Sequence, residues 1–170
     1  MKHLLVTGGA GFIGSNFVDL ALENNYSVTV LDALTYAGSL ENLKSATIQP
    51  NFQFIKGRIE DRQLVRSILE NNDISAVLNF AAESHVDNSI SGPRQFIDTN
   101  IVGTFELLEA ARDYWSNRRS KDFRFLHVST DEVFGALGAS GKFSEESPYA
   151  PNSPYSASKA GSDFLVRAWF

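Results

Sequence analysis

The stretch VTGGAGFIGSN, residues 6–16, decides the fold of this chain because it joins a short apolar strand to the start of a helix. Its glycines match the G-x-G-x-x-G pattern, and Gly8, Gly11 and Gly14 add a wider three-residue spacing. Glycines so placed allow a tight turn, let a pyrophosphate approach the backbone, and let the helix pack close to the strand. The free N–H groups of the helix N-terminus attract that anion. The stretch therefore predicts a dinucleotide-binding turn.

An acidic residue stands where such a turn requires one. Asp32 ends the second predicted strand, residues 27–32. A carboxylate at this place accepts a hydrogen bond from a ribose 2′-hydroxyl and repels a 2′-phosphate, so the sequence favours NAD over NADP. The alternative interpretation is a glycine turn followed by an ordinary solvated aspartate.

Apolar, strand-like runs alternate with helical patterns along the chain. This alternation is typical of a parallel sheet covered by helices on both faces. The predicted fold class is α/β, a doubly wound parallel sheet of the Rossmann type in one domain, residues 1–170. A Gly-, Ser- and Pro-rich segment, 135–154, is expected to be a surface excursion. The predicted strands are 3–7, 27–32, 52–57, 75–81 and 123–129, and the predicted helices are 12–25, 61–72, 93–117 and 155–170.

Composition excludes several classes of function. The 170 residues carry a net charge of −5, and no basic stripe interleaved with aromatics suggests a nucleic-acid partner. Without cysteine the chain has neither a disulfide framework nor a thiolate metal site, and its three histidines are scattered, so no metal is expected. No signal peptide and no apolar run of membrane-spanning length is present, which predicts a cytoplasmic protein without a membrane partner.

Polar segments follow four of the predicted strands. AAESHVD, residues 81–87, follows the fourth strand, and STDEVFG, residues 129–135, follows the fifth. In an open α/β sheet, ligands bind beyond the carboxyl ends of the strands. We therefore expect these segments to converge with the glycine turn and Asp32 at one edge of the sheet. A merely acidic turn is the alternative for STDEVFG.

The segment PYSASKAG, residues 154–161, adds a tyrosine and a lysine. Tyr155 and Lys159 are four positions apart and so share one helical face. A nearby ammonium favours the phenolate form of a tyrosine. Tyr155 is thus a candidate general base for a sugar or alcohol hydroxyl, and Lys159 is a candidate to hold a cofactor ribose. A chance Y-x-x-x-K is common, and the pair gains weight from the glycine turn and the strand end that precede it.

Together, the glycine turn, Asp32 and the Tyr155–Lys159 pair resemble the extended short-chain dehydrogenase/reductase superfamily. The stretches LDALTYAGSLENL, NFAAESHVDNSI, STDEVFG and PNSPYSASKAGSDFLVRAW resemble, more specifically, the dTDP-glucose 4,6-dehydratases. The resemblance covers nearly the whole chain. Its most discriminating part is Asp131-Glu132, because the 4-epimerases of the superfamily usually have Ser or Thr and small residues there.

The resemblance implies a lyase of nucleotide-sugar metabolism that uses NAD as a transient hydride acceptor. Tyr155, helped by Thr130, would take the proton of the glucose 4-hydroxyl while the C4 hydride passes to NAD. Glu132 would then take the C5 proton, and Asp131 would donate a proton to the departing C6 hydroxyl. Return of the hydride to C6 and reprotonation of C5 give a 4-keto-6-deoxy sugar. Elimination across C5–C6 needs a base and an acid at neighbouring atoms, which accounts for the adjacent carboxylates.

The resemblance also assigns positions around the ligands, with dTDP-glucose as the expected substrate and a homodimer as the expected full-length assembly. For His85, a hydrogen-bonded structural histidine is an equally open interpretation. The implied substrate-binding positions are Ser84, His85, Asn100 and Thr130. The implied cofactor-binding positions are Gly8, Gly11, Phe12, Ile13, Gly14, Asp32, Leu34, Thr35, Arg58, Ile59, Ala81, Ala82, Ser84, Thr99, Ser129, Tyr155 and Lys159.

Two positions depart from the family pattern. Arg58 stands where an Asp usually accepts a hydrogen bond from adenine, and an arginine cannot accept one. Recognition of adenine must therefore change, for example to stacking of the guanidinium on the base. Phe134 stands where a tyrosine is usual and removes a hydroxyl near the substrate. Neither change abolishes the implied mechanism.

Members of the resembled family continue about as far again, with a substrate-binding domain. We therefore expect this chain to be an N-terminal portion with weak or no activity by itself, because binding of the remote nucleotide positions the reacting sugar. Three hypotheses follow. The chain belongs to a 4,6-dehydratase, to another sugar-nucleotide enzyme such as a 4-epimerase, or to a non-catalytic NAD-binding module. The sequence leaves the nucleotide of the substrate open.

Overall fold

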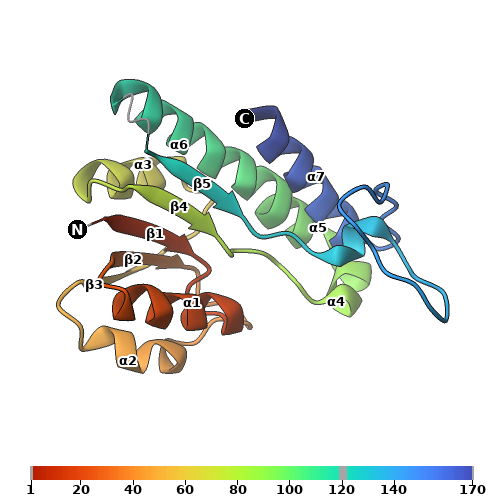
Figure 1. Cartoon of the computed structure of the whole chain (residues 1–170), viewed down its shortest axis with the longest axis horizontal. Helices are drawn as coiled ribbons and strands as arrows, with labels where there is room; N and C mark the ends of the chain where they lie inside the picture. The colour runs from red at the N-terminus through yellow and green to blue at the C-terminus, as the bar shows by residue number, and fades with distance from the viewer. Residues whose placement is uncertain (1, 119–121, 170) are drawn as a thin grey trace. The chain divides into compact units, whose positions relative to one another are not determined.

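The computed structural model describes residues 2–118 and 122–169. It divides into two compact units. The first unit holds a parallel sheet and its covering helices, and the second holds short helices, a long loop and the last helix (Figure 1). The first unit is residues 1–81 with 106–128, and the second is residues 82–105 with 129–170.

The sheet of the first unit has five parallel strands in the order β3-β2-β1-β4-β5. The central strand β1 pairs on both sides, so that Leu5 lies beside Thr29 and Val77. All five expected strands form, although β3, β4 and β5 are shorter than predicted. The strands are β1 (His3–Thr7), β2 (Ser27–Asp32), β3 (Phe52–Lys56), β4 (Ala76–Asn79) and β5 (Arg124–His127).

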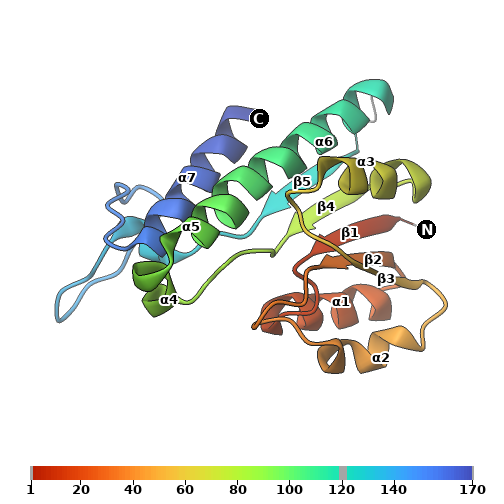
Figure 2. The ribbon, with the colours of Figure 1, turned by 180° about the vertical axis from the view of Figure 1, so that it is seen from behind.

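Helices cover both faces of this sheet (Figures 1 and 2). Successive strand residues point to opposite faces, so Leu4 packs in a cluster with Val18, while Leu5 packs in another with Val65 and Leu107. The prediction of a doubly wound α/β sheet is confirmed. The helices are α1 (Phe12–Glu23), η1 (Leu40–Leu43), α2 (Lys44–Thr47), α3 (Arg62–Asn71) and α6 (Thr104–Arg118), the last belonging to this unit from residue 106 onward.

The helix expected at 93–117 forms as one helical run, residues 93–118, whose middle part is π-helical. Pro93 begins a new helix directly after Gly92, as proline at a first helical position favours. The chain then continues through a π-helical segment, a form that often marks a functional site. The short helix that ends just before Gly92 lacks apolar periodicity and was not predicted. The elements are α4 (Val86–Ser91), α5 (Pro93–Phe96), η2 (Ile97–Gly103), η3 (Asp131–Phe134) and α7 (Pro154–Trp169).

The predicted excursion forms residues 135–153, between η3 and α7. It is fastened at its far end, where the Ala150 N–H donates to the Val133 carbonyl at 2.9 Å. Across residues 2–118 and 122–169, no helix is both long and apolar enough to cross a membrane. In the same ranges, no three His, Cys, Asp or Glu side chains gather in a group able to hold a metal ion.

Candidate functional site

Two of the three predicted glycines are required by the packing of the turn itself. Gly8 has a φ of +69°, and a Cβ on it would lie 2.6 Å from the Ala81 amide nitrogen. A Cβ on Gly14 would lie 2.3 Å from the Gly8 carbonyl oxygen. Gly11 differs, because its nearest atoms would be 3.4 Å and 3.9 Å from an added Cβ. The absence of a side chain at Gly11 therefore keeps space open in front of α1 rather than relieving a clash.

The N-terminus of α1 is suited to an anion. Its cap residue is Gly11, and within α1, which is described in full, no side chain caps the first turn and no acidic residue lies in it. The first N–H groups are therefore available, and the helix dipole favours a negative group there. Phe12 and Ile13 are exposed beside this turn. These residues fit the pyrophosphate of a dinucleotide.

Asp32 ties the glycine turn to the loop that follows β2. The side chain is 8% exposed, and its two oxygens accept hydrogen bonds from the N–H groups of Ala10 at 2.9 Å and Leu34 at 2.8 Å. A Cβ on Gly38 would lie 2.7 Å from the Asp32 Oδ1. Each carboxylate oxygen keeps a further lone pair for a ligand. Sequence reasoning missed the structural role of Asp32, and its predicted bond to ribose stays a prediction.

A polar chain that was not predicted crosses the carboxyl ends of three strands in the first unit. The Thr7 hydroxyl donates to the Asn79 Oδ1 at 2.6 Å, and the Asn79 Nδ2 donates to the His127 Nδ1 at 3.0 Å. Thr7 and Asn79 are buried. The chain fixes the ends of β1, β4 and β5. In the sequence, the signal for this hydrogen-bonded chain is a polar residue at the last position of each apolar strand.

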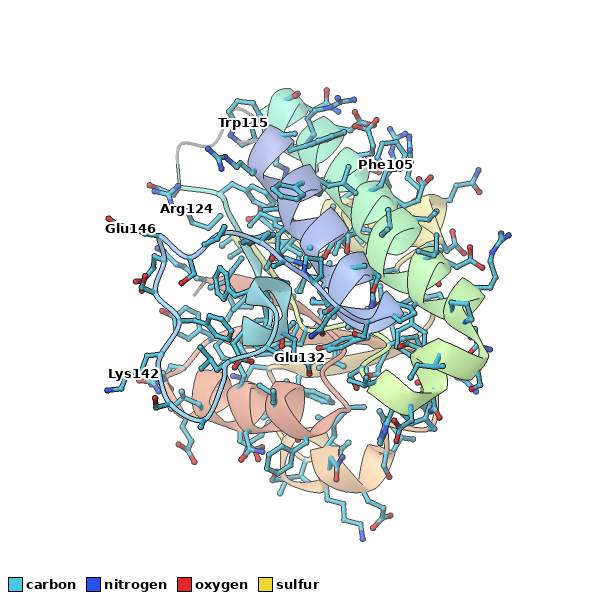
Figure 3. All side chains as sticks on the ribbon, turned by 90° about the vertical axis from the view of Figure 1, so that its right-hand side faces the viewer. Phe105, Trp115, Arg124, Glu132, Lys142 and Glu146 are labelled. Atoms are coloured by element: carbon cyan, nitrogen blue, oxygen red, sulfur yellow. The ribbon has the colours of Figure 1, made fainter. Side chains whose placement is uncertain are left out.

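In the second unit, Thr130 begins the turn that carries the two carboxylates. Its hydroxyl accepts a hydrogen bond from the Glu132 N–H at 3.3 Å and so caps η3. Asp131 is exposed and Glu132 is half-buried. Gly135, with a φ of +98°, ends the turn. Residues 130–134, called the 130–134 turn below, therefore present two adjacent carboxylates in a fixed local backbone; Figure 3 shows the Glu132 side chain.

Tyr155 and Lys159 lie together on the buried face of α7. Tyr155 is 9% exposed and packs edge-on against Phe96, with 6.3 Å between ring centroids. Lys159 is 4% exposed. Burial lowers the pKa of Lys159 to about 8, and the nearby charge of Asp163 acts in the opposite direction. A lysine with this pKa is charged near neutral pH and releases its proton more readily than a solvated one.

Asn100 joins the loop after β4 to α7. It is 1% exposed on the π-helical segment. Its Nδ2 donates to the Glu83 carbonyl at 3.0 Å and to the Ser158 hydroxyl at 2.8 Å, and its Oδ1 accepts from the Glu83 N–H at 2.9 Å. The Ser158 hydroxyl in turn donates to the Tyr155 carbonyl at 2.7 Å. This contact positions the start of α7, and the predicted contact of Asn100 with the substrate stays a prediction.

The remaining predicted positions are spread over both units. Arg58 is exposed and pairs with Glu60 at 3.6 Å, while Ile59 beside it is buried. Ser129 is exposed and donates a hydrogen bond to Asp163. Of the other positions, Ser84 and His85 are exposed. The rest are half-buried, namely Leu34, Thr35, Ala81, Ala82 and Thr99.

Comparison with known proteins gives a consistent assignment. The family model for GDP-mannose 4,6 dehydratase matches residues 5–170. A dTDP-glucose 4,6-dehydratase of Xanthomonas campestris pv. campestris (strain B100) is 61% identical over 172 residues, covering 99% of this chain and 49% of that protein.

Solved structures agree with this. The dTDP-glucose 4,6-dehydratase from Streptomyces venezuelae with NAD and TYD bound aligns with a TM-score of 0.90 at 48% identity, over 99% of this chain and 51% of that one. The UDP-glucose 4-epimerase of Thermotoga maritima aligns with a TM-score of 0.85 at 31% identity, over 99% of this chain and 51% of that one. The chain spans about half the length of the curated relatives it matches. With nearly all its residues matched by the family model and such a glycine turn at its N-terminus, the chain belongs to the GDP-mannose 4,6 dehydratase family.

Proposed function

We propose that this chain binds NAD and supplies the acid–base residues for dehydration of a nucleotide-activated glucose, dTDP-glucose, to its 4-keto-6-deoxy product. One observation carries the proposal. The 130–134 turn sets Asp131 and Glu132 side by side directly after Thr130, in the same unit as the buried Tyr155–Lys159 pair. Relatives that are 61% and 48% identical to the chain are dTDP-glucose 4,6-dehydratases.

The first unit supplies the groups that would hold NAD. The uncapped N-terminus of α1 faces the space that Gly11 leaves open, which suits the pyrophosphate. Asp32 has lone pairs left for a ribose hydroxyl, and its charge disfavours a 2′-phosphate. When bound, NAD supplies a hydride acceptor for C4 and a hydride donor for C6.

Proton removal from the 4-hydroxyl falls to Tyr155. A tyrosine is a poor base unless its phenolate is stabilised, and the ammonium of Lys159 supplies a positive charge on the same helical face. The Thr130 hydroxyl accepts from the Glu132 N–H and donates to the Asp131 Oδ1 at 3.5 Å, a long hydrogen bond that a sugar oxygen can replace as acceptor. Tyr155 therefore acts as base, and Thr130 orients the hydroxyl that reacts.

Elimination falls to the two carboxylates. The ketone formed at C4 acidifies the C5 proton, which Glu132 would accept, while Asp131 would deliver a proton to the C6 hydroxyl as it leaves as water. The C5–H and C6–O bonds break, and a C5–C6 double bond forms. The two groups must begin in opposite protonation states. Glu132 is half-buried and Asp131 is exposed.

The decisive experiment incubates the protein with NAD and dTDP-glucose and measures the alkaline absorbance of a 4-keto-6-deoxy product. We expect only slow product formation from the wild type, because the chain spans about half the length of its curated relatives, and none from Glu132→Gln. The matched control is Glu145→Gln on the exposed excursion, which should behave as wild type. Conversion of UDP-glucose to UDP-galactose would instead indicate a 4-epimerase. Retention of NAD with no turnover of any sugar nucleotide would indicate a non-catalytic NAD-binding module.

A homodimeric assembly of the full-length protein and a cytoplasmic location are also proposed, and both rest on the resemblance to the dehydratases. Light scattering coupled to size-exclusion chromatography measures the mass of the assembly directly. A mass of one chain at all concentrations would contradict it.

A further inference from the structure

Asp163 lies on α7, one helical turn after Lys159, and receives hydrogen bonds from two other segments of the second unit. Its Oδ2 accepts from the Ser129 hydroxyl at 2.5 Å and from the Tyr149 hydroxyl at 2.9 Å. Ser129 immediately precedes the 130–134 turn, and Tyr149 comes from the end of the excursion. One carboxylate oxygen therefore connects three segments.

Aromatic packing fixes the donor Tyr149. Its ring meets Phe134 edge-on, with 5.3 Å between centroids, and lies 5.1 Å from the ring of Phe164 on α7. Burial, and then the hydrogen bond to Asp163, raise the pKa of Tyr149. The hydroxyl consequently keeps its proton and donates at neutral pH. The contact to Asp163 is held by packing on both η3 and α7.

Asp163 also acts on Lys159 through its charge. Burial lowers the pKa of Lys159, and the negative charge of Asp163 raises it again. Residues four apart on a helix are neighbours on its surface, which accounts for the effect. The other ionisable side chains on α7 and on the elements packed against it are Asp87, Arg94, Asp98, Asp131, Glu132, Tyr155 and Arg167.

We propose that Asp163 is a positioning residue that fastens the start of the 130–134 turn to α7 and keeps the amine of Lys159 charged beside Tyr155. It acts through Ser129 and Lys159 and contacts neither sugar nor NAD. The inference rests on the proposed function, since that function gives the turn and the lysine their purpose. The inference can be tested without measuring enzymatic turnover.

The first test is an NMR titration of the Lys159 side chain, with its signal assigned by its loss in Lys159→Met. We expect a midpoint of about 8 in the wild type and a lower midpoint in Asp163→Asn. Asp163→Glu, which restores the charge, should return the midpoint toward the wild-type value. The matched control is Glu146→Gln, at the outer edge of the excursion (Figure 3), which should leave the midpoint unchanged.

An unchanged midpoint in a folded Asp163→Asn variant would overturn the proposal, and so would an equal shift in the Glu146→Gln control. Neither NAD nor a sugar nucleotide is present during the titration. Failure of the dehydratase assay therefore leaves this result standing, and failure of the titration leaves the dehydratase assay standing.

A second test isolates the hydrogen bond and serves if Asp163→Asn does not fold. Ser129→Ala removes one donor to Asp163 and keeps every charge. We expect faster amide hydrogen exchange at Glu132, Val133 and Gly135, whose N–H groups bond within the turn. The Lys159 midpoint should not move. Wild-type exchange at these amides in Ser129→Ala, or equal acceleration in the control Ser144→Ala, would show that Asp163 does not hold the turn.

Discussion

At the scale of single residues, the glycine turn must fold tightly and must also leave space for a ligand. Gly14 serves the first requirement and Gly11 the second. Gly14 is required by folding, since a Cβ there would meet the Gly8 carbonyl at 2.3 Å. Gly11 has room for a methyl group, so its value lies in the space it leaves for a ligand. Substitution at the two positions should therefore have different consequences.

Gly14→Ala should lower the free energy of unfolding by roughly 3 kcal/mol or prevent folding, because a backbone clash deep in the turn forces the helix away from the strand. Gly11→Ala should cost less than about 1 kcal/mol, the usual range for a change at a helix cap. It should nevertheless weaken NAD binding strongly, because its methyl group would occupy the anion space. Urea unfolding and isothermal titration with NAD measure the two effects. Equal NAD affinity in Gly11→Ala and wild type would contradict this assignment.

The buried charge of Lys159 destabilises the fold, and the proposed reaction needs that charge. Its pKa falls from the ordinary 10.5 to about 8 in the folded chain. Below pH 8 both folded and unfolded states carry the proton, and the fold bears the whole cost of a buried charge. Between pH 8 and 10.5 the folded state is neutral while the unfolded state is still charged. Stability therefore rises across that window and is lowest below it.

At pH 7, Lys159→Met should consequently have a larger free energy of unfolding than wild type, by up to roughly 3 kcal/mol, since each unit by which the pKa of Lys159 is lowered corresponds to about 1.36 kcal/mol. The difference should shrink as pH rises from 8 to 10.5, and dehydration should be lost. Urea unfolding of both proteins at pH 7 and pH 10 compares the two. A variant less stable than wild type at pH 7 would show that the lysine stabilises the fold.

At the scale of elements, the π-helical segment η2 owes its place to Asn100. Its side chain links the loop after β4 to α7 through three hydrogen bonds. Inside the same helix run, the buried hydroxyl of Thr104 has no hydrogen-bond partner among the described residues. A helix that carries such local costs persists only because neighbouring contacts hold it.

Asn100→Ala should lower the free energy of unfolding by about 2–4 kcal/mol, because it leaves the backbone groups of Glu83 buried without partners. Asn88→Ala, on the exposed side of α4, is the control and should change stability by less than about 0.5 kcal/mol. Thermal and urea unfolding measure both. Near-wild-type stability of Asn100→Ala would mean that water replaces the side chain.

At the scale of the whole molecule, the sheet ends at β5, and no other strand among the described residues pairs with its outer edge. Leu126 on this strand is 48% exposed. Unpaired edges and exposed apolar side chains promote association between chains. The chain should therefore self-associate as its concentration rises.

Leu126→Lys should reduce this self-association by placing a charge on the edge strand. Sedimentation velocity over a concentration series measures the effect. Leu137→Lys, on the excursion, introduces the same charge at another exposed leucine and is the control. An equal reduction in both variants would point to net charge rather than to the strand as the cause.

The sequence predicted the five strands, the doubly wound class and the positions of Tyr155, Lys159, Asp131 and Glu132. Local patterns suffice for these, because apolar runs, glycine spacing and a four-residue helical repeat act over short distances. It missed the helix α4, whose polar residues carry no helical periodicity, and the π-helical form of η2 within the helix expected at 93–117.

The sequence by itself therefore determined the fold class and the residue types to which we assign the proposed chemistry. Only the tertiary structure decided how they are held. Asp32 fastens the glycine turn, Asn100 fastens α7, and Asp163 joins Ser129 and Tyr149. These contacts join residues from separate segments, and burial decides the pKa of Lys159. Neither spacing nor composition encodes which distant atoms will share a hydrogen bond.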